Sequence, residues 1–272
     1  MLFTVFTPIY NGAKTIHRVY ESLKNQTCQD FEWIIINDGS TDNSEEVILT
    51  IISKEPAWRI KYFHQSNLGK HTAWNRAVKE AAGELFLSAD CDDSFDEDAL
   101  DFFRKKWQAI EDKNHVSGIN VCCRDNISKR LVAEWYPQDG MISNNVDLDY
   151  IYKITGEHWG ILSTKVLKKY PFPLIKGHHY SENYIWYGMA LDGYKCYCYN
   201  KILRTYYIEP KSLTHDKTQN TDIDRLKMVY HFNLWKVRNL SFYFLNIKPL
   251  LLIKLYNEFL RSCIKLMIKK YI

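Results

Sequence analysis

The chain has 272 residues, a formal net charge of +4 at pH 7 and 46% apolar residues. This composition supplies enough apolar side chains for a packed core and excludes a disordered chain. The basic residues form no stripe over the first two hundred positions, so nucleic acid is not expected as a partner.

The first half of the chain alternates between short β-rich runs and stretches with helical spacing. The runs predict strands at 2–7, 31–37, 59–64 and 84–89, and the stretches predict helices at 13–26, 44–54, 69–82 and 97–111. Strands that alternate with helices of this length form a mostly parallel sheet with helices on both faces. The expected fold class is therefore α/β.

The second half of the chain is less regular. It predicts a strand at 116–124, a polar and turn-rich stretch at 129–149, a turn with a short helix at 157–169, a helix at 184–191 and an aromatic strand at 194–207. We expect substrate specificity to depend on the poorly patterned region 129–179.

Three polar clusters directly follow apolar strands in the first half. They are Pro8-Ile9-Tyr10-Asn11, Asp38-Gly39-Ser40 and Asp90-Cys91-Asp92-Asp93. In an open α/β sheet, ligands bind beyond the carboxyl ends of the strands, and the topology brings these ends to one edge. The clusters therefore predict a single site.

Asp90 and Asp92 are spaced so that both carboxylates project the same way at the end of a strand. One could hold ribose hydroxyls and the other a divalent metal, and such oxygen ligands suit magnesium or manganese. A metal that bridges the phosphates of a nucleotide diphosphate would stabilise the charge on the leaving group. The alternative is an acidic turn with solvated carboxylates.

Asp38 also ends an apolar strand, and its carboxylate could accept the N3 hydrogen of a uracil. The alternative is an Asx-turn or a helix N-cap, because Asp42 and Ser44 open the next helix. Tyr10 could lie against the base as an aromatic platform, or it could simply pack at the end of its strand.

Five stretches of the first half form a recognisable series. They are Thr7-Pro8-Ile9-Tyr10-Asn11, Tyr20-Glu21-Ser22-Leu23-Lys24-Asn25-Gln26-Thr27, Asp30-Phe31-Glu32-Trp33-Ile34-Ile35-Ile36-Asn37-Asp38-Gly39-Ser40-Thr41-Asp42, Asn67-Leu68-Gly69-Lys70-His71 with Asn75, and Asp90-Cys91-Asp92-Asp93. Together they closely resemble the opening of family-2 glycosyltransferases, over roughly the first 110 residues. These enzymes have the GT-A fold, in which a nucleotide-binding α/β sheet merges with an acceptor-binding part.

For the donor, the resemblance implies that Pro8 and Tyr10 border the base of a UDP-sugar. Asp38 would read the base, and Lys70 would lie near the base or the diphosphate. Asn37 departs from the family, which usually has a first aspartate there, but the matching reader of the base is the second position, Asp38.

For the metal, the resemblance implies that Asp90 holds the ribose and that Asp92 is the principal ligand of manganese or magnesium, with Asp93 in support. Some relatives use a late histidine as a further metal or phosphate ligand. His215 would take that part here, and a surface histidine is the alternative.

An inverting transfer also needs a carboxylate that takes the proton of the acceptor hydroxyl. Ser181-Glu182-Asn183, at the start of a predicted helix, is similar to the family pattern, in which a Glu-Asp or Asp pair supplies this base. Asn183 replaces the usual aspartate, so Glu182 is the expected catalytic base. A glutamate that only complements the helix dipole is the alternative, and Asp192 and Glu157 are the next candidates.

The C-terminal segment 241–272 is basic and amphipathic. Its charged side chains are Lys248, Lys254, Arg261, Lys265, Lys269 and Lys270 against the single acidic Glu258. A basic helix with a wide apolar face can lie at the surface of an anionic membrane. A terminal helix that packs on the body of the protein or on the second subunit of a homodimer is the equal alternative.

Seven cysteines without zinc-type Cys-x-x-Cys pairs favour free thiols in a reducing cytosol. The first eight residues lack the basic and long apolar regions of a signal peptide, and no apolar run reaches the roughly 20 residues that span a bilayer. We therefore expect a cytoplasmic protein, with a peripheral position on the inner face of the cell membrane as the second expectation.

The expected organisation is a nucleotide-sugar-binding part at 1–112, an acceptor-binding part with the catalytic base at 113–220, and a helical extension at 221–272. The expected function is inverting transfer of a sugar from a UDP-sugar to a saccharide or lipid-linked saccharide in bacterial surface polysaccharide assembly.

Two other functions stay open. A nucleotidyltransferase would show a Gly-rich basic loop after the first strand, where this chain reads Pro8-Ile9-Tyr10-Asn11-Gly12. A non-catalytic sugar- or nucleotide-binding module would lack a base, and Glu182 argues against it while Asn183 keeps it open.

Overall fold

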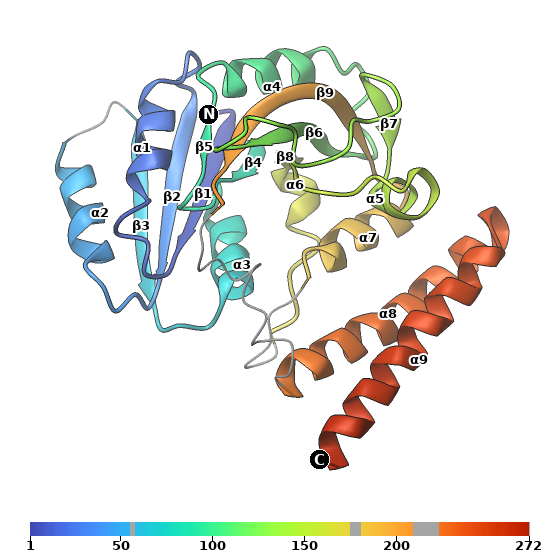
Figure 1. The fold of residues 1–272 in the computed structure, drawn as a ribbon. Helices are drawn as coiled ribbons and strands as arrows, with labels where there is room; N and C mark the ends of the chain where they lie inside the picture. Colours follow the sequence, from blue (N-terminus) through green and yellow to red (C-terminus); the bar gives the residue numbers. More distant parts are fainter. Residues whose placement is uncertain (55–57, 175–180, 209–222, 272) are drawn as a thin grey trace.

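The computed structural model describes residues 1–54, 58–174, 181–208 and 223–271, which form a nine-stranded sheet covered by helices (Figure 1). Across the sheet the strands follow the order β3-β2-β1-β4-β8-β6-β9-β5, and β7 pairs with β9. The predicted α/β class with a C-terminal helical part is confirmed.

The first four strands pair in parallel, as the sequence predicts. They are β1 (Phe3–Ile9), β2 (Phe31–Asp38), β3 (Arg59–Gln65) and β4 (Leu85–Ser88). The helices between and after them are α1 (His17–Lys24), α2 (Ser44–Ser53), α3 (Lys70–Glu80) and α4 (Ala99–Gln108). Because the four strands run in parallel, their carboxyl ends meet at one edge of the sheet.

Side chains that alternate along each strand build two cores, one on each face of the sheet. Phe3 and Val5 of β1 pack with α1, α2 and α4, whereas Phe6 packs with α3 and with two later helices. These later helices are α6 (Thr164–Leu167) and α7 (Asn183–Leu191). Because β1 and β2 are covered on both faces, their apolar runs are nearly continuous.

The prediction of only a turn and a short helix at 157–169 is wrong in its first half. Strand β8 (His158–Ser163) lies there, between β4 and β6 (Val116–Asp125), and is antiparallel to both. Two glycines permit the close contact with β6. A Cβ on Gly118 would lie 1.9 Å from the Ile161 carbonyl oxygen, and a Cβ on Gly160 would lie 2.0 Å from the Ile119 carbonyl oxygen.

The remaining strands complete the far side of the sheet. Strand β9 (Lys195–Tyr206) pairs in parallel with β6 and antiparallel with the short β5 (Ser94–Phe95) and β7 (Met141–Ser143). The stretch 129–149, expected to be turn-rich, thus contains a strand, followed by the short α5 (Asn145–Asp147) and a π-helical turn (Leu148–Tyr152).

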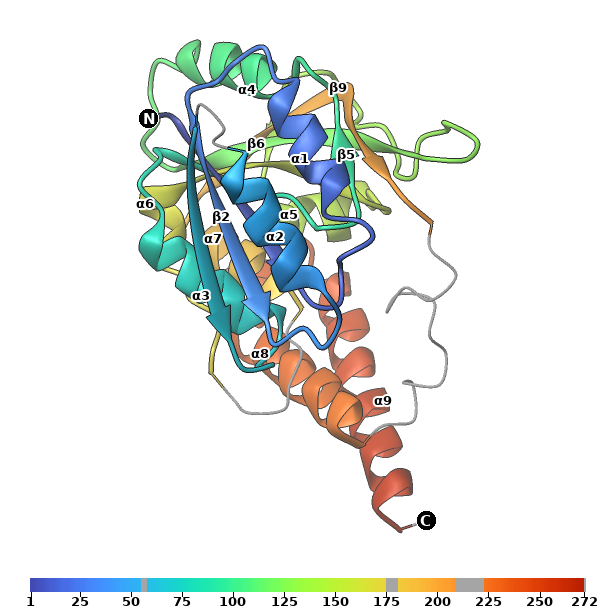
Figure 2. The same cartoon turned by 90° about the vertical axis from the view of Figure 1, so that its left-hand side faces the viewer.

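Two long helices, α8 (Ile223–Ile247) and α9 (Leu250–Tyr271), form a hairpin at the C-terminus. Leu240 and Phe244 of α8 and Leu255 of α9 are fully buried and pack with Val146, Tyr150 and Tyr187 of the body. Among the described residues, no helix is long and apolar enough to span a membrane. Figure 2 shows β2 pointing towards the end of the molecule at which the hairpin lies.

Candidate active site

The first two polar clusters join through Asn11, which follows β1. Its side-chain oxygen accepts hydrogen bonds from the backbone N–H groups of Thr41 (2.7 Å) and Asp42 (3.3 Å), and its own N–H donates to Ser40 Oγ (3.0 Å). The loops after β1 and β2 are therefore one connected surface at the carboxyl edge of the sheet.

Asp38, at the end of β2, is buried and holds the turn that leads into α3. Its carboxylate accepts hydrogen bonds from the backbone N–H groups of Leu68 (3.0 Å) and Gly69 (2.8 Å) and from Gln65 Nε2 (2.8 Å). A carboxylate has about four acceptor positions, so one more donor such as a uracil N3–H can be accommodated. The reading of a base by Asp38 stays a prediction.

Pro8 and Tyr10 lie on either side of the end of β1. Pro8 is half-buried and pairs in register with Ile36, whereas the Tyr10 side chain is 51% exposed. Ordinary strand-end packing would bury the Tyr10 ring. Its exposure leaves the ring free for a planar ligand.

Lys70 links the first half of the chain to the start of α7. Its Nζ atom lies 2.9 Å from Asp90 Oδ1 and 3.1 Å from Glu182 Oε1. Burial disfavours the charged ammonium, but the negative charges of Asp90 and Glu182 outweigh it and raise the pKa of Lys70. Asp90 and Glu182, the expected base, are far apart in sequence but contact the same cation.

Arg204 of β9 is a second cation at this site, and the sequence patterns did not single it out. Its guanidinium donates to Asp93 Oδ2 (2.8 Å from Nε) and to Glu157 Oε1 (3.0 Å from Nη1), and Nη2 lies 3.6 Å from Asp90 Oδ2. Arginine is almost never buried unless it is paired, and Arg204 is 5% exposed.

Four carboxylates therefore gather around two cations. Burial alone would raise the pKa of Asp90, but Lys70 and Arg204 hold it below its usual range. Burial and the charge of Asp90 raise the pKa of Asp92, and burial with the charges of Asp90 and Glu182 raises that of Glu157 although Arg204 opposes it.

Among the described residues, no three His, Cys, Asp or Glu side chains are already arranged as a metal centre. The Asp92 carboxylate nevertheless offers the oxygen ligands that a hard divalent cation prefers, and burial together with the charge of Asp90 raises its pKa, an effect that a bound cation would oppose. Asp93 is already paired with Arg204, so its support of such a cation stays a prediction. The predicted ligand His215 lies outside the described residues.

Comparison with known proteins decides the family. A family model described as glycosyl transferase family 2 matches residues 4–170, more than half of the chain. The chain belongs to glycosyl transferase family 2. This assignment agrees with the series of motifs in the first half and rules out the nucleotidyltransferase alternative.

Similar proteins extend the assignment. The chain is 38% identical over 135 residues to a chondroitin synthase of Pasteurella multocida, a match that covers 50% of the chain and 14% of the synthase. The chain thus corresponds to a small part of such relatives.

Solved structures share the fold. The structure of S. aureus TarS 1–349 in complex with UDP-GlcNAc has a TM-score of 0.69 at 19% identity, over 96% of this chain and 72% of the TarS 1–349 chain. The mannosyltransferase PcManGT of Pyrobaculum calidifontis, in complex with GDP-Man and Mn²⁺, has a TM-score of 0.63 at 16% identity, over 99% of this chain and 75% of that one. The GT-A fold expected for the family is therefore present.

Of the two other base candidates of this glycosyltransferase, one lies in the same cluster as Glu182 and the other lies far from it. Glu157 belongs to the same carboxylate cluster as Glu182 and is held by Arg204. Asp192 follows the far end of α7, about 15 Å along the helix from Glu182, and accepts a hydrogen bond from the Tyr170 hydroxyl (2.5 Å). The Asn183 side chain donates to the Tyr187 hydroxyl (3.3 Å).

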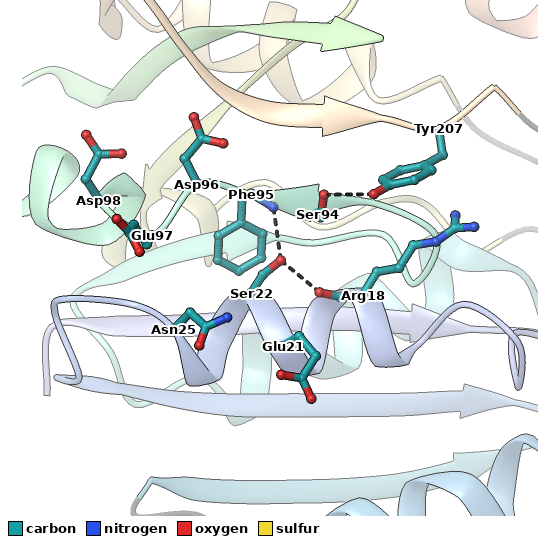
Figure 3. Close-up of a pocket in the computed structure, with 10 residues that line it drawn as sticks. All are labelled: Arg18, Glu21, Ser22, Asn25, Ser94, Phe95, Asp96, Glu97, Asp98 and Tyr207. Carbon is teal, nitrogen blue, oxygen red and sulfur yellow. Dashed lines mark hydrogen bonds between the residues drawn. The ribbon is translucent and has the colours of Figure 1, made fainter. Parts of the chain in front are cut away.

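A pocket of ≈ 740 Å³ lies between α1 and β5 (Figure 3). It is lined by Arg18, Glu21, Ser22, Asn25, Ser94, Phe95, Asp96, Glu97, Asp98 and Tyr207. Arg18 connects it to the site, since its Nη1 donates to the Asp92 carbonyl oxygen (2.6 Å). Among the described residues that line it, none is a predicted donor or base residue, so we assign the donor site to the strand ends instead.

Proposed function

We propose that this family-2 glycosyltransferase moves a sugar from a UDP-sugar onto a carbohydrate acceptor with inversion at the transferred carbon. The observation that carries the proposal is the bridge from Asp90 through Lys70 to Glu182. It supports the proposal because Glu182, the proposed base, shares a cation with Asp90, which we expect to hold the donor. The UDP-GlcNAc complex of the structural neighbour TarS supports the donor class.

In the proposed complex, Pro8 and Tyr10 border the uracil, Asp38 accepts its N3 hydrogen and Asp90 holds the ribose. Lys70 turns from its two carboxylates towards the incoming diphosphate, to which it offers a positive charge. Manganese or magnesium bound by Asp92, with Asp93 in support and His215 as the further ligand expected from the family, would stabilise the charge that grows on the leaving UDP.

Glu182 then takes the proton from the acceptor hydroxyl, which attacks the sugar on the side opposite the leaving group. Arg204 keeps Asp93 and Glu157 in place and offsets part of the negative charge of the cluster. We further propose that residues 1–112 bind the donor and 113–220 bind the acceptor, with 221–272 as an extension.

The similarity to a chondroitin synthase supports a saccharide acceptor in polysaccharide assembly. A free oligosaccharide and a lipid-linked saccharide present the same hydroxyl to Glu182. Because the chain spans a small part of such synthases, the acceptor is proposed as a class alone.

Thermal unfolding with a panel of nucleotide sugars and manganese tests the donor class. A ligand that binds only the folded state stabilises it by about 2.7 kcal/mol at one hundred times its dissociation constant. We expect UDP-sugars with manganese to raise the melting temperature and GDP-sugars to have little effect. Stabilisation by GDP-sugars alone would contradict the uracil assignment.

Calorimetry with Asp92→Asn tests the metal ligand. We expect the variant to lose the part of UDP affinity that depends on manganese, whereas Glu46→Gln, an exposed change on α2, should bind as the unmodified chain does. Unchanged UDP affinity of Asp92→Asn in manganese would contradict the assignment.

A further inference from the structure

The outer side of α9 carries a continuous row of exposed apolar side chains. Their spacing is that of one side of a helix, and they are Leu250 (74% exposed), Ile253 (62%), Tyr256 (51%), Leu260 (56%), Ile264 (44%), Met267 (53%) and Ile268 (55%). The row extends over roughly 27 Å of helix. Isolated exposed apolar residues are ordinary, but a continuous row marks an interaction surface.

The opposite side of α9 already has its partner. Leu255 is fully buried, Ser262 is 4% exposed, and Glu258 forms an ion pair with Lys236 of α8 (2.6 Å). Figure 1 shows α9 on the side of α8 that faces away from α7. The packing of the hairpin therefore leaves the apolar row uncovered by the described part of the chain.

A line of cations lies beside the apolar row. Arg261, Lys265 and Lys269 follow one another every four residues, and all three are exposed. Glu258 is the only acidic residue in the sequence of α9, and Lys236 neutralises it. The outer surface of the helix thus combines an apolar row with an uncompensated positive edge.

We propose that α9 lies flat in the headgroup region of an anionic lipid bilayer, with its apolar row in the acyl boundary and its cations on lipid phosphates. Helices of this composition bind membranes through apolar burial plus attraction to anionic lipids. A second copy of the chain fits the surface less well, because it would bring two such positive edges together.

The position of the hairpin adds to the proposal. Helix α8 packs on α7, which directly follows Glu182, through Tyr184 with Phe232 (5.0 Å between ring centres) and Trp235 (5.1 Å). The carboxyl edge of β2 also points towards the hairpin end (Figure 2). A bilayer bound by α9 would lie at the same end of the molecule as the site.

Co-flotation of the full chain with lipid vesicles tests the proposal independently of sugar transfer. The vesicles are phosphatidylcholine alone and phosphatidylcholine with phosphatidylglycerol, at low salt. One variant combines Arg261→Gln, Lys265→Gln and Lys269→Gln, and another combines Ile253→Gln, Leu260→Gln and Ile264→Gln. The control combines Ile127→Gln and Leu174→Gln, both 71% exposed and outside the hairpin.

We expect the chain and the control to bind only the anionic vesicles. Removal of three cations should weaken binding about a hundredfold, since each contributes roughly fivefold near the surface. The apolar variant should lose binding as well, with unchanged circular dichroism.

Three results would overturn the proposal. The first is an unmodified chain that ignores anionic vesicles, and the second is hairpin variants that float as well as the control. The third is a dimer in sedimentation that the apolar variant makes monomeric while the unmodified chain binds no vesicles; the row would then be a subunit interface.

Discussion

Lys70 is the residue at which donor and base chemistry meet. Its single positive charge is shared by the carboxylates of Asp90 and Glu182, which it holds together. A donor diphosphate would compete with the two carboxylates for the same ammonium, which would release Glu182 for the acceptor proton.

Loss of the Lys70 charge should weaken donor binding. A hydrogen bond to a charged group contributes about 1.5–3 kcal/mol, so we expect Lys70→Gln to lower UDP affinity roughly ten- to a hundredfold. Lys79→Gln, on an exposed position of the same helix, should not change it. Equal affinities of the two variants in calorimetry would show that Lys70 does not contact the nucleotide.

The sequence predicts that three of the expected donor residues lie close together, because each stands at or just after the end of an apolar strand. Asp38, Asp90 and Asp92 all lie at strand ends, and the parallel topology brings those ends together. Arg204 could not be predicted in this way, because its partners Asp93 and Glu157 are distant in the chain. The one available signal was a charged residue directly after Ile202 and Leu203, within an aromatic strand.

Among the elements, the first four strands match their predicted ranges closely, and the apolar runs of β1 and β2 are the clearest because they are buried on both faces. Strand β8 was missed, because His158-Trp159-Gly160-Ile161-Leu162-Ser163 has a glycine in its interior, which ordinarily weakens a strand. Here the glycine is needed for the close approach of β6. The contact of Gly160 with β6, and not the local sequence, explains the glycine at this position.

The close pairing of β6 with β8 should therefore be sensitive to the addition of a single methyl group. Gly118→Ala would place a Cβ against the Ile161 carbonyl, so we expect a loss of about 3 kcal/mol in the free energy of unfolding. Gly193→Ala is the control, since no atom lies within 4 Å and only its positive φ is costly, by about 1–2 kcal/mol. Equal losses of unfolding free energy for the two variants in urea denaturation would contradict the close pairing of β6 with β8.

For the whole molecule, Glu32 connects the parallel half of the sheet. It is fully buried, accepts hydrogen bonds from the Thr4 hydroxyl and the Ala82 N–H (2.8 Å each), and pairs with Lys61 (2.9 Å). Burial alone would raise the pKa of Glu32, but Lys61, Ala82 and Thr4 hold it below its usual value. Such a carboxylate stabilises the fold above its unfolded-state pKa.

The contribution of Glu32 should disappear as the pH falls through its lowered folded-state pKa. At neutral pH we expect Glu32→Gln to cost about 3 kcal/mol, because it leaves Lys61 without its buried partner. The difference in melting temperature between the variant and the unmodified chain should shrink in acid, whereas Glu46→Gln should show no such trend. A difference that stays constant from neutral to acidic pH would contradict this role.

The measurement that tests the central claim most directly compares turnover and UDP affinity of Glu182→Gln, Glu157→Gln and Asp192→Asn. A positioned base contributes about a hundred- to ten-thousandfold in rate. We predict that Glu182→Gln loses turnover on this scale with unchanged UDP affinity, that Glu157→Gln loses less, and that Asp192→Asn stays close to the unmodified enzyme. Near-normal turnover of Glu182→Gln, with the large loss in Glu157→Gln or Asp192→Asn instead, would contradict the assignment of Glu182 as the base.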